Sequence, residues 1–329
     1  MNWHKSLPEF LDLYFGEGMR SLWKDGKSKV WWNNQEWDAK RKLGRMARSK
    51  SESAFLIPAQ RVLTLRDGWP RPFSDYSPGD PFSVRWFSEK LRLLMEQELG
   101  SGDAVFPKIK RLKAEYRKLL EDAIFGKFRL TVDTFRSQRR LVLSQAKGGK
   151  SLPYMVWSAG QREFVPLLLG LYWLMPPAKV SQQGSVRWVI IEEPEMGMHP
   201  RAITTVLLLV LELLDRNYRV CISTHSPQVL ELVWVLRVLQ NTRAEPGDLL
   251  RLFAARRTPG LIGVAERVLT KTLKVYYFEG ESGGVRDISD LDPSSLDENE
   301  ATWGGMVEFS RRANETVATA MGAPRGGRS

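Results

Sequence analysis

The feature that most constrains the fold is a regular alternation of short apolar runs and longer amphipathic stretches from Gln161 to Gln240. Two runs, Val186–Ile191 and Arg219–Ser223, have the length and apolar character of buried strands. They alternate with Gln161–Met175, Ala202–Asp215 and Gln228–Gln240, which have the length and apolar spacing of helices. Buried strands that alternate with helices favour a parallel sheet with crossover helices. The sequence therefore predicts an α/β fold for this half of the chain.

The first motif that could carry chemistry is Ser158-Ala159-Gly160-Gln161, between a predicted strand and a predicted helix. Small residues at such a step let backbone amides and a hydroxyl approach a phosphate, and the following helix points its positive end at the same place. Ser158 equally suits an ordinary helix N-cap. The motif alone therefore leaves a phosphate contact and a simple cap both open.

The second motif is the run Val189-Ile190-Ile191 followed by Glu192 and Glu193. Ligands of open α/β sheets bind beyond the carboxyl ends of the strands. Adjacent residues there point in different directions, so one carboxylate could hold Mg²⁺ through water while the next polarises an attacking water. A charged turn after a core strand is the alternative interpretation.

The third motif places His225 two residues after the predicted strand Arg219–Ser223. A histidine at that edge could contact a γ-phosphate or orient a water. A lone histidine at a strand end is more often a structural hydrogen-bonding group. This motif is informative because it follows the other two motifs along the chain.

Together the three motifs resemble a known family. WSAGQREFVPLLLGL looks like the signature motif and helix of ATP-binding-cassette (ABC) proteins. VIIEEPEMGMHP resembles the Walker B strand, catalytic glutamate and D-loop of the SMC/RecF/OLD-like AAA ATPases, and CISTHSPQVL resembles their switch-histidine strand. The resemblance covers about residues 157–230. It implies an ABC-type P-loop NTPase core, a mostly parallel sheet with crossover helices, together with a helical lobe and β-hairpins.

The resemblance also implies roles for the acidic residues and the histidine. Glu192 would be the Walker B residue that binds Mg²⁺, although aspartate is the usual residue there. Glu193 would be the general base or water-positioning glutamate, and His225 the switch histidine. The turn Met196–Pro200 would be the D-loop at a dimer interface.

Four further residues would contact the nucleotide if the resemblance holds. Ser158, Gly160 and Gln161 would contact the γ-phosphate of an ATP held by a partner chain. Gln60, in FLIPAQR, would be the Q-loop glutamine that senses Mg²⁺.

The phosphate-binding loop G-x-x-x-x-G-K-[ST] of the family is not found in this sequence. Gly26-Lys27-Ser28 and Gly149-Lys150-Ser151 end correctly, but Ser21 and Ser144 stand where the first glycine is needed. Neither string has the preceding strand and following helix that the motif requires. We therefore expect an incomplete N-terminal lobe, a chain that starts downstream of the loop, and very weak independent ATP binding.

Outside the motifs, the pattern predicts a hairpin at Ser21–Trp32 with its turn at Asp25-Gly26, and a closing hairpin at Lys274–Ser289. It also predicts a helix at Ile109–Phe125 and a strand at Leu152–Trp157. The expected organisation is a partial N-terminal lobe with a basic hairpin and helical insertion (1–150), a C-terminal ATPase lobe (151–310) and a flexible tail (311–329).

The run from Tyr276 to Gly280 resembles the start of a Toprim nuclease domain. Such a domain needs an Asp-X-Asp pair tens of residues further on to complete a metal site. Asp290 and Asp292 lie too close to Gly280 for that role. The hairpin is therefore the preferred interpretation of this tail.

The net charge of +11 and isoelectric point of about 9.7 favour an anionic partner such as nucleic acid. Basic residues and tryptophans gather between Lys24 and Arg48, where a solvated face is the alternative. The one cysteine, Cys221, lies in an apolar run and fits a reducing compartment. No apolar stretch reaches membrane-spanning length. We expect a cytoplasmic protein with no membrane partner.

Two functions remain open at this point. The first is an ATPase that acts as a homodimer, or as a heterodimer with another ATPase chain, in DNA repair or phage defence. The second is a non-catalytic regulatory or DNA-binding subunit that supplies only the signature motif to a partner ATPase.

Overall fold

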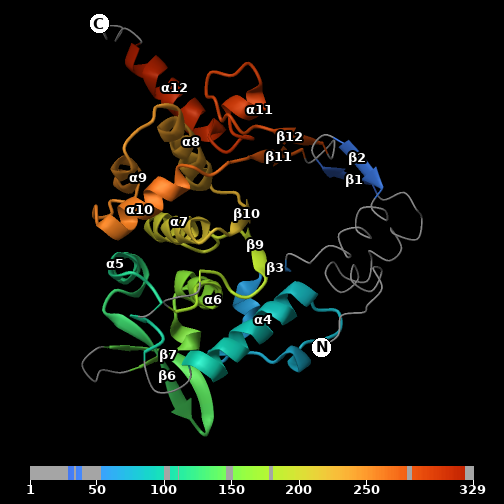
Figure 1. Cartoon of the computed structure of the whole chain (residues 1–329), viewed down its shortest axis with the longest axis vertical. Coiled ribbons are helices and arrows are strands. Elements are labelled where there is room, and N and C mark those ends of the chain that lie inside the picture. Colours follow the sequence, from blue (N-terminus) through green and yellow to red (C-terminus); the bar gives the residue numbers. More distant parts are fainter. Residues whose placement is uncertain are drawn as a thin grey trace, which may run out of the picture. The chain divides into compact units, whose positions relative to one another are not determined.

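The computed structural model describes residues 29–32, 35–38, 53–99, 104–109, 111–145, 151–177, 181–279 and 284–322 (Figure 1). The chain divides into two compact units, Met1–Ser223 and Thr224–Ser329, and each is described by itself. The boundary at residue 150 that the sequence predicts falls inside the first unit.

The centre of the first unit is a three-stranded parallel sheet in the order β10-β9-β3. Its strands are β3 (Ser53–Ile57), β9 (Val186–Glu192) and β10 (Arg219–Ser223). The crossover from β9 to β10 runs through α7 (Pro200–Asp215). The α/β pattern predicted from Val186 to Ser223 is therefore confirmed.

Helices cover one face of this sheet, and that face forms the core. Phe55, Ile57, Val189 and Ile191 are all fully buried. Phe55 and Ile57 of β3 lie against α4 (Phe82–Leu94) and α6 (Ala159–Leu174). The ring of Phe55, for example, stacks on Trp173 of α6 with 4.4 Å between centroids. Figure 1 shows α6 and α7 beside the strands and α4 next to β3.

The opposite face of the sheet is less covered. Trp188 and Ile190 of β9 are half-buried, while Arg219, Cys221 and Ser223 of β10 are exposed. The prediction that Arg219–Ser223 is a buried strand is therefore wrong, and Cys221 within it is exposed. The reason is that β10 is an edge strand among the described strands, and alternate side chains of a strand point to opposite faces.

The other elements of the first unit are short helical turns, short strands, the helix α5 and a β-meander. Several of them, η1 and η2 among them, pack on α4, and α5 packs on α7. In chain order they are η1 (Arg61–Thr64), β4 (Leu65–Arg66), β5 (Trp69–Pro70), η2 (Phe73–Asp75), η3 (Met95–Leu99), α5 (Ala114–Leu120), η4 (Glu121–Phe125), β6 (Phe128–Phe135), β7 (Gln138–Gln145), β8 (Leu152–Pro153) and η5 (Tyr154–Val156).

Two predicted elements in this part of the first unit need correction. The helix predicted at Ile109–Phe125 begins only at Ala114 and ends in a π-helical turn. The strand predicted at Leu152–Trp157 is limited to two residues, because Pro153 offers no amide to a neighbouring strand. In the N-terminal region, β1 (Lys29–Trp32) pairs with β2 (Gln35–Asp38), whereas the turn predicted at Asp25-Gly26 lies outside the described residues.

The second unit is mainly helical. Its elements are α8 (Pro227–Asn241), α9 (Pro246–Leu252), α10 (Pro259–Val268), β11 (Tyr276–Phe278), β12 (Val285–Asp287), α11 (Glu298–Ala301) and α12 (Glu308–Gly322). A small core of Leu230, Ile288, Leu291 and Trp303 joins α8 to the hairpin and the following loop. The antiparallel pairing of β11 with β12 confirms the predicted closing hairpin. The predicted flexible tail overlaps α12, and residues 323–329 lie outside the description.

Candidate active site

The paired glutamates lie where the sequence places them, at the carboxyl end of the central strand β9. Glu192 is half-buried and is the last residue of the strand, level with Ser223 of β10. Its Oε2 accepts a hydrogen bond from the backbone amide of Ala59 at 3.0 Å. That amide belongs to the turn after β3, so the carboxylate joins the ends of two neighbouring strands. Because one oxygen is engaged in this way, the side chain of Glu192 is held at the sheet edge.

Glu193 has an unusual backbone conformation. Its φ is 43°, in the left-handed region that residues other than glycine rarely adopt. Its amide donates to the carbonyl of Ser223 at 2.9 Å, and its own carbonyl accepts the amide of Met196 at 3.1 Å. Strain of this kind costs of order 1–3 kcal/mol and gathers at functional sites. Other contacts must therefore hold this turn in place.

Arg61 supplies those contacts. Its side chain is completely buried, directly behind the strand end. Its guanidinium donates to the carbonyl of Glu192 through Nη1 and to the carbonyl of Glu193 through Nη2, each at 3.0 Å. Its Nε donates to the carbonyl of Glu163 at 3.2 Å and lies 3.6 Å from that residue's Oε2. One side chain thus fixes both glutamates of the pair through their backbones.

The electrostatics of this cluster follow from burial. Burial lowers the pKa of Arg61, and the nearby carboxylates, Glu163 foremost, oppose that shift. Burial raises the pKa of Glu163, and Arg61 partly offsets that rise. Arginine stays protonated in proteins, so the guanidinium keeps its positive charge beside the glutamates. Arg61 was not among the residues predicted from the sequence. The feature that could have indicated it is a single cationic residue two positions after the apolar run FLIPA.

Gln60, which the sequence proposes as a sensor of Mg²⁺, is exposed. It begins the 3-10 turn η1 without a side-chain cap, and its carbonyl accepts the amide of Leu63 at 3.0 Å. It follows Ala59, whose amide binds Glu192. The structure therefore brings Gln60 to the correct edge of the sheet but gives its side chain no contact with the glutamates, and its role stays a prediction.

Ser158 and Gln161 begin α6 as a reciprocal capping box. The Ser158 Oγ accepts the amide of Gln161 at 3.2 Å, and the Gln161 Oε1 accepts the amide of Ser158 at 3.1 Å. The Gln161 Nε2 also donates to the carbonyl of Ile124 at 3.4 Å. The ordinary cap that the sequence left open is therefore present, and both ends of the Gln161 amide are engaged within the first unit.

The first turn of α6 packs closely against the turn Met196–Pro200. A Cβ added to Gly160 would lie 3.1 Å from the carbonyl oxygen of Gly197. Gly197 has a φ of 68°, and a Cβ there would lie 3.1 Å from Cγ of Glu163. Two glycines thus allow the signature-like motif, the D-loop-like turn and Glu163 to approach one another. Gly160, Glu163 and the glutamate pair therefore belong to one packed cluster.

His225 lies two residues beyond the end of β10, at the start of the second unit, and is exposed. The following residue, Ser226, donates its amide to Oγ1 of Thr224 at 2.9 Å. The role of His225 as a switch histidine stays a prediction.

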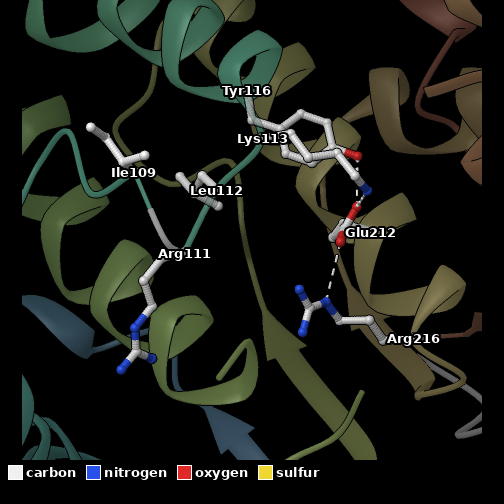
Figure 2. Close-up of a pocket in the computed structure, with 7 residues that line it drawn as sticks. All are labelled: Ile109, Arg111, Leu112, Lys113, Tyr116, Glu212 and Arg216. Carbon is white, nitrogen blue, oxygen red and sulfur yellow. Dashed lines mark hydrogen bonds and ion pairs between the residues drawn. The ribbon is translucent and has the colours of Figure 1, made fainter. Parts of the chain in front are cut away.

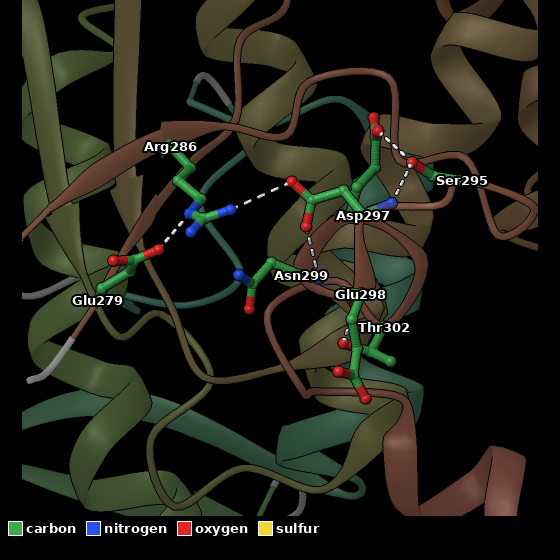
Figure 3. Close-up of polar contacts among 8 residues, drawn as sticks. Glu279, Arg286, Ser295, Asp297, Glu298, Asn299 and Thr302 are labelled. Carbon is green, nitrogen blue, oxygen red and sulfur yellow. Dashed lines mark hydrogen bonds and ion pairs between the residues drawn. The ribbon is translucent and has the colours of Figure 1, made fainter.

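The tail residue Glu279 is part of an ion-pair chain. Its carboxylate accepts a hydrogen bond from Nε of Arg286, whose Nη1 lies 3.3 Å from Oδ2 of Asp297 (Figure 3). Asp297 in turn caps α11 by accepting the amide of Asn299 at 2.9 Å. The carboxylates here hold the hairpin and α11. Within the described ranges, no group of three or more His, Cys, Asp or Glu residues could hold a metal ion.

A pocket of about 260 Å³ in the first unit also gathers charged groups (Figure 2). At its centre Glu212 of α7 accepts hydrogen bonds from the Tyr116 hydroxyl at 2.8 Å and from Nε of Arg216 at 3.2 Å, and it pairs with Lys113. Burial, followed by the charge of Glu212, raises the pKa of Tyr116. Three donors converge on this carboxylate, so the cluster ties α5 to α7.

Comparison with known proteins gives one family. A family model described as "AAA domain, putative AbiEii toxin, Type IV TA system" matches residues 22–231 of this chain. The match covers well over half of the 329 residues and contains all seven candidate site residues. No curated protein matches the sequence. Among the helices that the structure describes, none is long and apolar enough to cross a membrane.

Proposed function

The chain belongs to this family of AAA domains, and on that basis we propose that it takes part in ATP hydrolysis as an ABC-type ATPase of the SMC/RecF/OLD-like class. The order of the three motifs supports this finer class, and with it a role in DNA repair or phage defence. The observation that carries the proposal is the carboxyl end of β9, where Arg61 holds Glu192 and Glu193 by their carbonyls and Glu193 takes a strained backbone.

The donor set at this edge fits a magnesium–nucleotide complex. Mg²⁺ in such sites takes one or two carboxylates together with phosphate oxygens and water, and it neutralises charge on the transferred phosphate. Ala59 occupies one oxygen of Glu192, which leaves the other for the hydration shell of the ion. Glu193 would polarise the attacking water. The sequence offers no G-x-x-x-x-G-K-[ST] loop for the phosphates, so the proposal is limited to the carboxylate side of the site.

A second ATPase chain, identical or different, is part of the proposal. The N-terminus of α6, with Ser158, Gly160 and Gln161, would face the γ-phosphate of an ATP held by that partner. The first amides of a helix have no partner within it and favour an anion. The packing of Gly160 on Gly197 supports this arrangement, because contact between chains at the Met196–Pro200 turn would then move α6 directly.

Glu193→Gln tests the proposal. The variant keeps the size of the side chain and loses the base, so the turnover of Mg²⁺–ATP by the full chain should fall by about 10²- to 10⁴-fold. ATP binding should persist, and size-exclusion chromatography with ATP should show more dimer than for the wild type. The exposed Glu231→Gln in α8 is the matched control and should leave turnover unchanged. Equal turnover of both variants, or a wild type that is inactive also in the presence of the second ATPase chain, would contradict ATP hydrolysis at this site.

A non-catalytic subunit is the second candidate. It is favoured by the lack of a phosphate loop in the sequence. In that case Glu193→Gln would change nothing. The chain would instead alter ATP hydrolysis by a partner ATPase, and changes at Gly160 would remove that effect.

A further inference from the structure

The β6–β7 hairpin is a ribbon whose outer part stands apart from the rest of the first unit. Its strands pair continuously from Phe128 opposite Gln145 to Phe135 opposite Gln138. The root is anchored: Leu130 and Leu141 are fully buried, and the amide of Leu141 donates to the carbonyl of Gly68 at 2.8 Å. The third strand, β8, reaches only Val142 and Leu143. Beyond that point the ribbon is two-stranded, and Figure 1 shows it extending away from α4 and α6.

The exposed part of this ribbon is strongly basic. Between Lys127 and Gln145 the chain has five cationic side chains and one carboxylate. That carboxylate, Asp133, pairs with Arg140 across the strands at 2.9 Å. The cations Lys127, Arg129, Arg136 and Arg139 form no ion pair within the described part of the chain. Such a concentration of unpaired positive charge needs an anionic partner or remains solvated.

The tip of the ribbon adds an aromatic ring to these charges. Phe135 is 50% exposed, although it is one of the largest apolar side chains of the hairpin. The guanidinium of Arg140 lies 4.4 Å from the centre of its ring, and that of Arg136 lies 5.2 Å from it. These cations keep the ring at the surface in contact with charge, where a planar base could stack on it.

The turn itself uses residues that its geometry disfavours. Arg136 and Ser137 connect the strands, with φ of 49° and 64°. A two-residue hairpin turn with both φ values positive favours Asn-Gly, because an arginine side chain crowds the backbone in this conformation. Strain at a position that supports no internal packing indicates a use for the side chain outside the fold.

From these observations we propose that the hairpin tip, Asp133–Arg140, binds nucleic acid. Arg136 and Arg139 would contact the sugar-phosphate backbone, and Phe135 would stack on a base. A two-stranded ribbon fits the major groove of a duplex, and an exposed ring with arginines also suits a single strand. An acidic protein would account for the charges but not for the exposed ring. This inference stands on the hairpin alone and does not depend on ATP hydrolysis.

The experiment measures the binding of the full chain to a labelled 20-nucleotide DNA, as a single strand and as a duplex, by fluorescence anisotropy from 50 to 200 mM salt. We expect the double variant Arg136→Ala/Arg139→Ala to bind at least 10-fold more weakly. The slope of log K against log salt should fall by about 2, because roughly two phosphate contacts are lost. Phe135→Ala should weaken single-strand binding by about 5- to 100-fold and duplex binding less.

The control is Arg243→Ala/Arg256→Ala. It removes two exposed arginines of the second unit that pair with no acid among the described residues, so the net charge changes by the same amount. We expect less than a 3-fold effect. Circular dichroism melting establishes that the hairpin variant is folded. Equal weakening by both double variants, a wild type that binds neither DNA, or an equal loss of binding to polyglutamate would overturn the proposal; the last outcome would identify an acidic protein partner.

Discussion

At the scale of single residues, the candidate site depends on one buried cation. Arg61 is completely buried and gives three hydrogen bonds to backbone carbonyls on β9 and α6. A buried charge is stable only when its hydrogen-bonding groups are satisfied. Here the partners are the carbonyls of the two glutamates, so the requirement to pair Arg61 also fixes the backbone that presents Glu192 and Glu193.

Replacing Arg61 should destabilise the first unit. Arg61→Met keeps much of the volume but leaves the carbonyls of Glu192, Glu193 and Glu163 without their donor. We expect the free energy of unfolding to fall by about 3 kcal/mol. Urea unfolding measures the change, with the exposed Arg66→Met as the control at about 0.5 kcal/mol or less. If the free energy of unfolding fell by less than about 1 kcal/mol in Arg61→Met, the strained turn at Glu193 would not depend on the hydrogen bonds from Arg61.

Glu163 should make the stability of the first unit depend on pH. Burial raises its pKa above the usual value near 4.5. The carboxyl proton of Glu163 is then bound more tightly in the native state than in the unfolded chain. The contribution of Glu163 to stability is therefore largest below pH 4.5, and it is lost as the pH rises through the raised pKa. Glu163→Gln cannot ionise. Relative to the wild type, this variant should therefore gain stability from pH 4.5 to 7.

Urea unfolding at pH 4.5, 5.5 and 7 measures this difference. Glu266→Gln, at an exposed position of α10, is the matched control and should show no such trend. If Glu163→Gln instead lost stability relative to the wild type with rising pH, the ion pair with Arg61 would outweigh the burial of Glu163.

At the scale of elements, α6 links the core to the candidate site through glycines at both ends. Gly160 lets its first turn approach Gly197. Gly170 lets its last turns approach α4, since an added Cβ would lie 2.9 Å from Cε2 of Phe87 and 3.3 Å from Cδ1 of Ile57. Because both contacts are on one helix, its position on α4 determines where the signature-like turn lies.

Gly170→Ala should therefore be destabilising, although alanine favours helix by about 1 kcal/mol over glycine. Phe87 is fully buried and has no room to move, and overpacking of this kind costs about 1–3 kcal/mol. We expect a net loss of about 1 kcal/mol in thermal or urea unfolding. Gly263→Ala in α10, where the nearest atoms belong to the flexible side chain of Arg267, should be neutral or stabilising. A stabilised Gly170→Ala variant would show that α4 and α6 can separate freely.

At the scale of the whole molecule, the periodicity of the chain predicted most of the elements and the topology of the first-unit sheet from Val186 onward. It also placed Glu192 and Glu193 correctly, because residues after a buried parallel strand reach the edge of the sheet. It missed α9 and α10, which are short, and it misjudged β10. Sequence periodicity reports whether a run is apolar, whereas the exposure of an edge strand depends on which strands lie beside it.

The sequence by itself determined the α/β class, the order of the motifs and the residue types at the strand ends, since these follow from local patterns. Only the tertiary structure decided what those residues contact. Arg61 reaches the carbonyls of two residues that are more than 130 positions away. Gly160 packs against Gly197, which lies 37 positions further along the chain. Contacts between distant segments leave no period in the sequence. The pairing that holds the glutamates, and the exposed tip of the β6–β7 ribbon with Phe135, therefore became visible only in three dimensions.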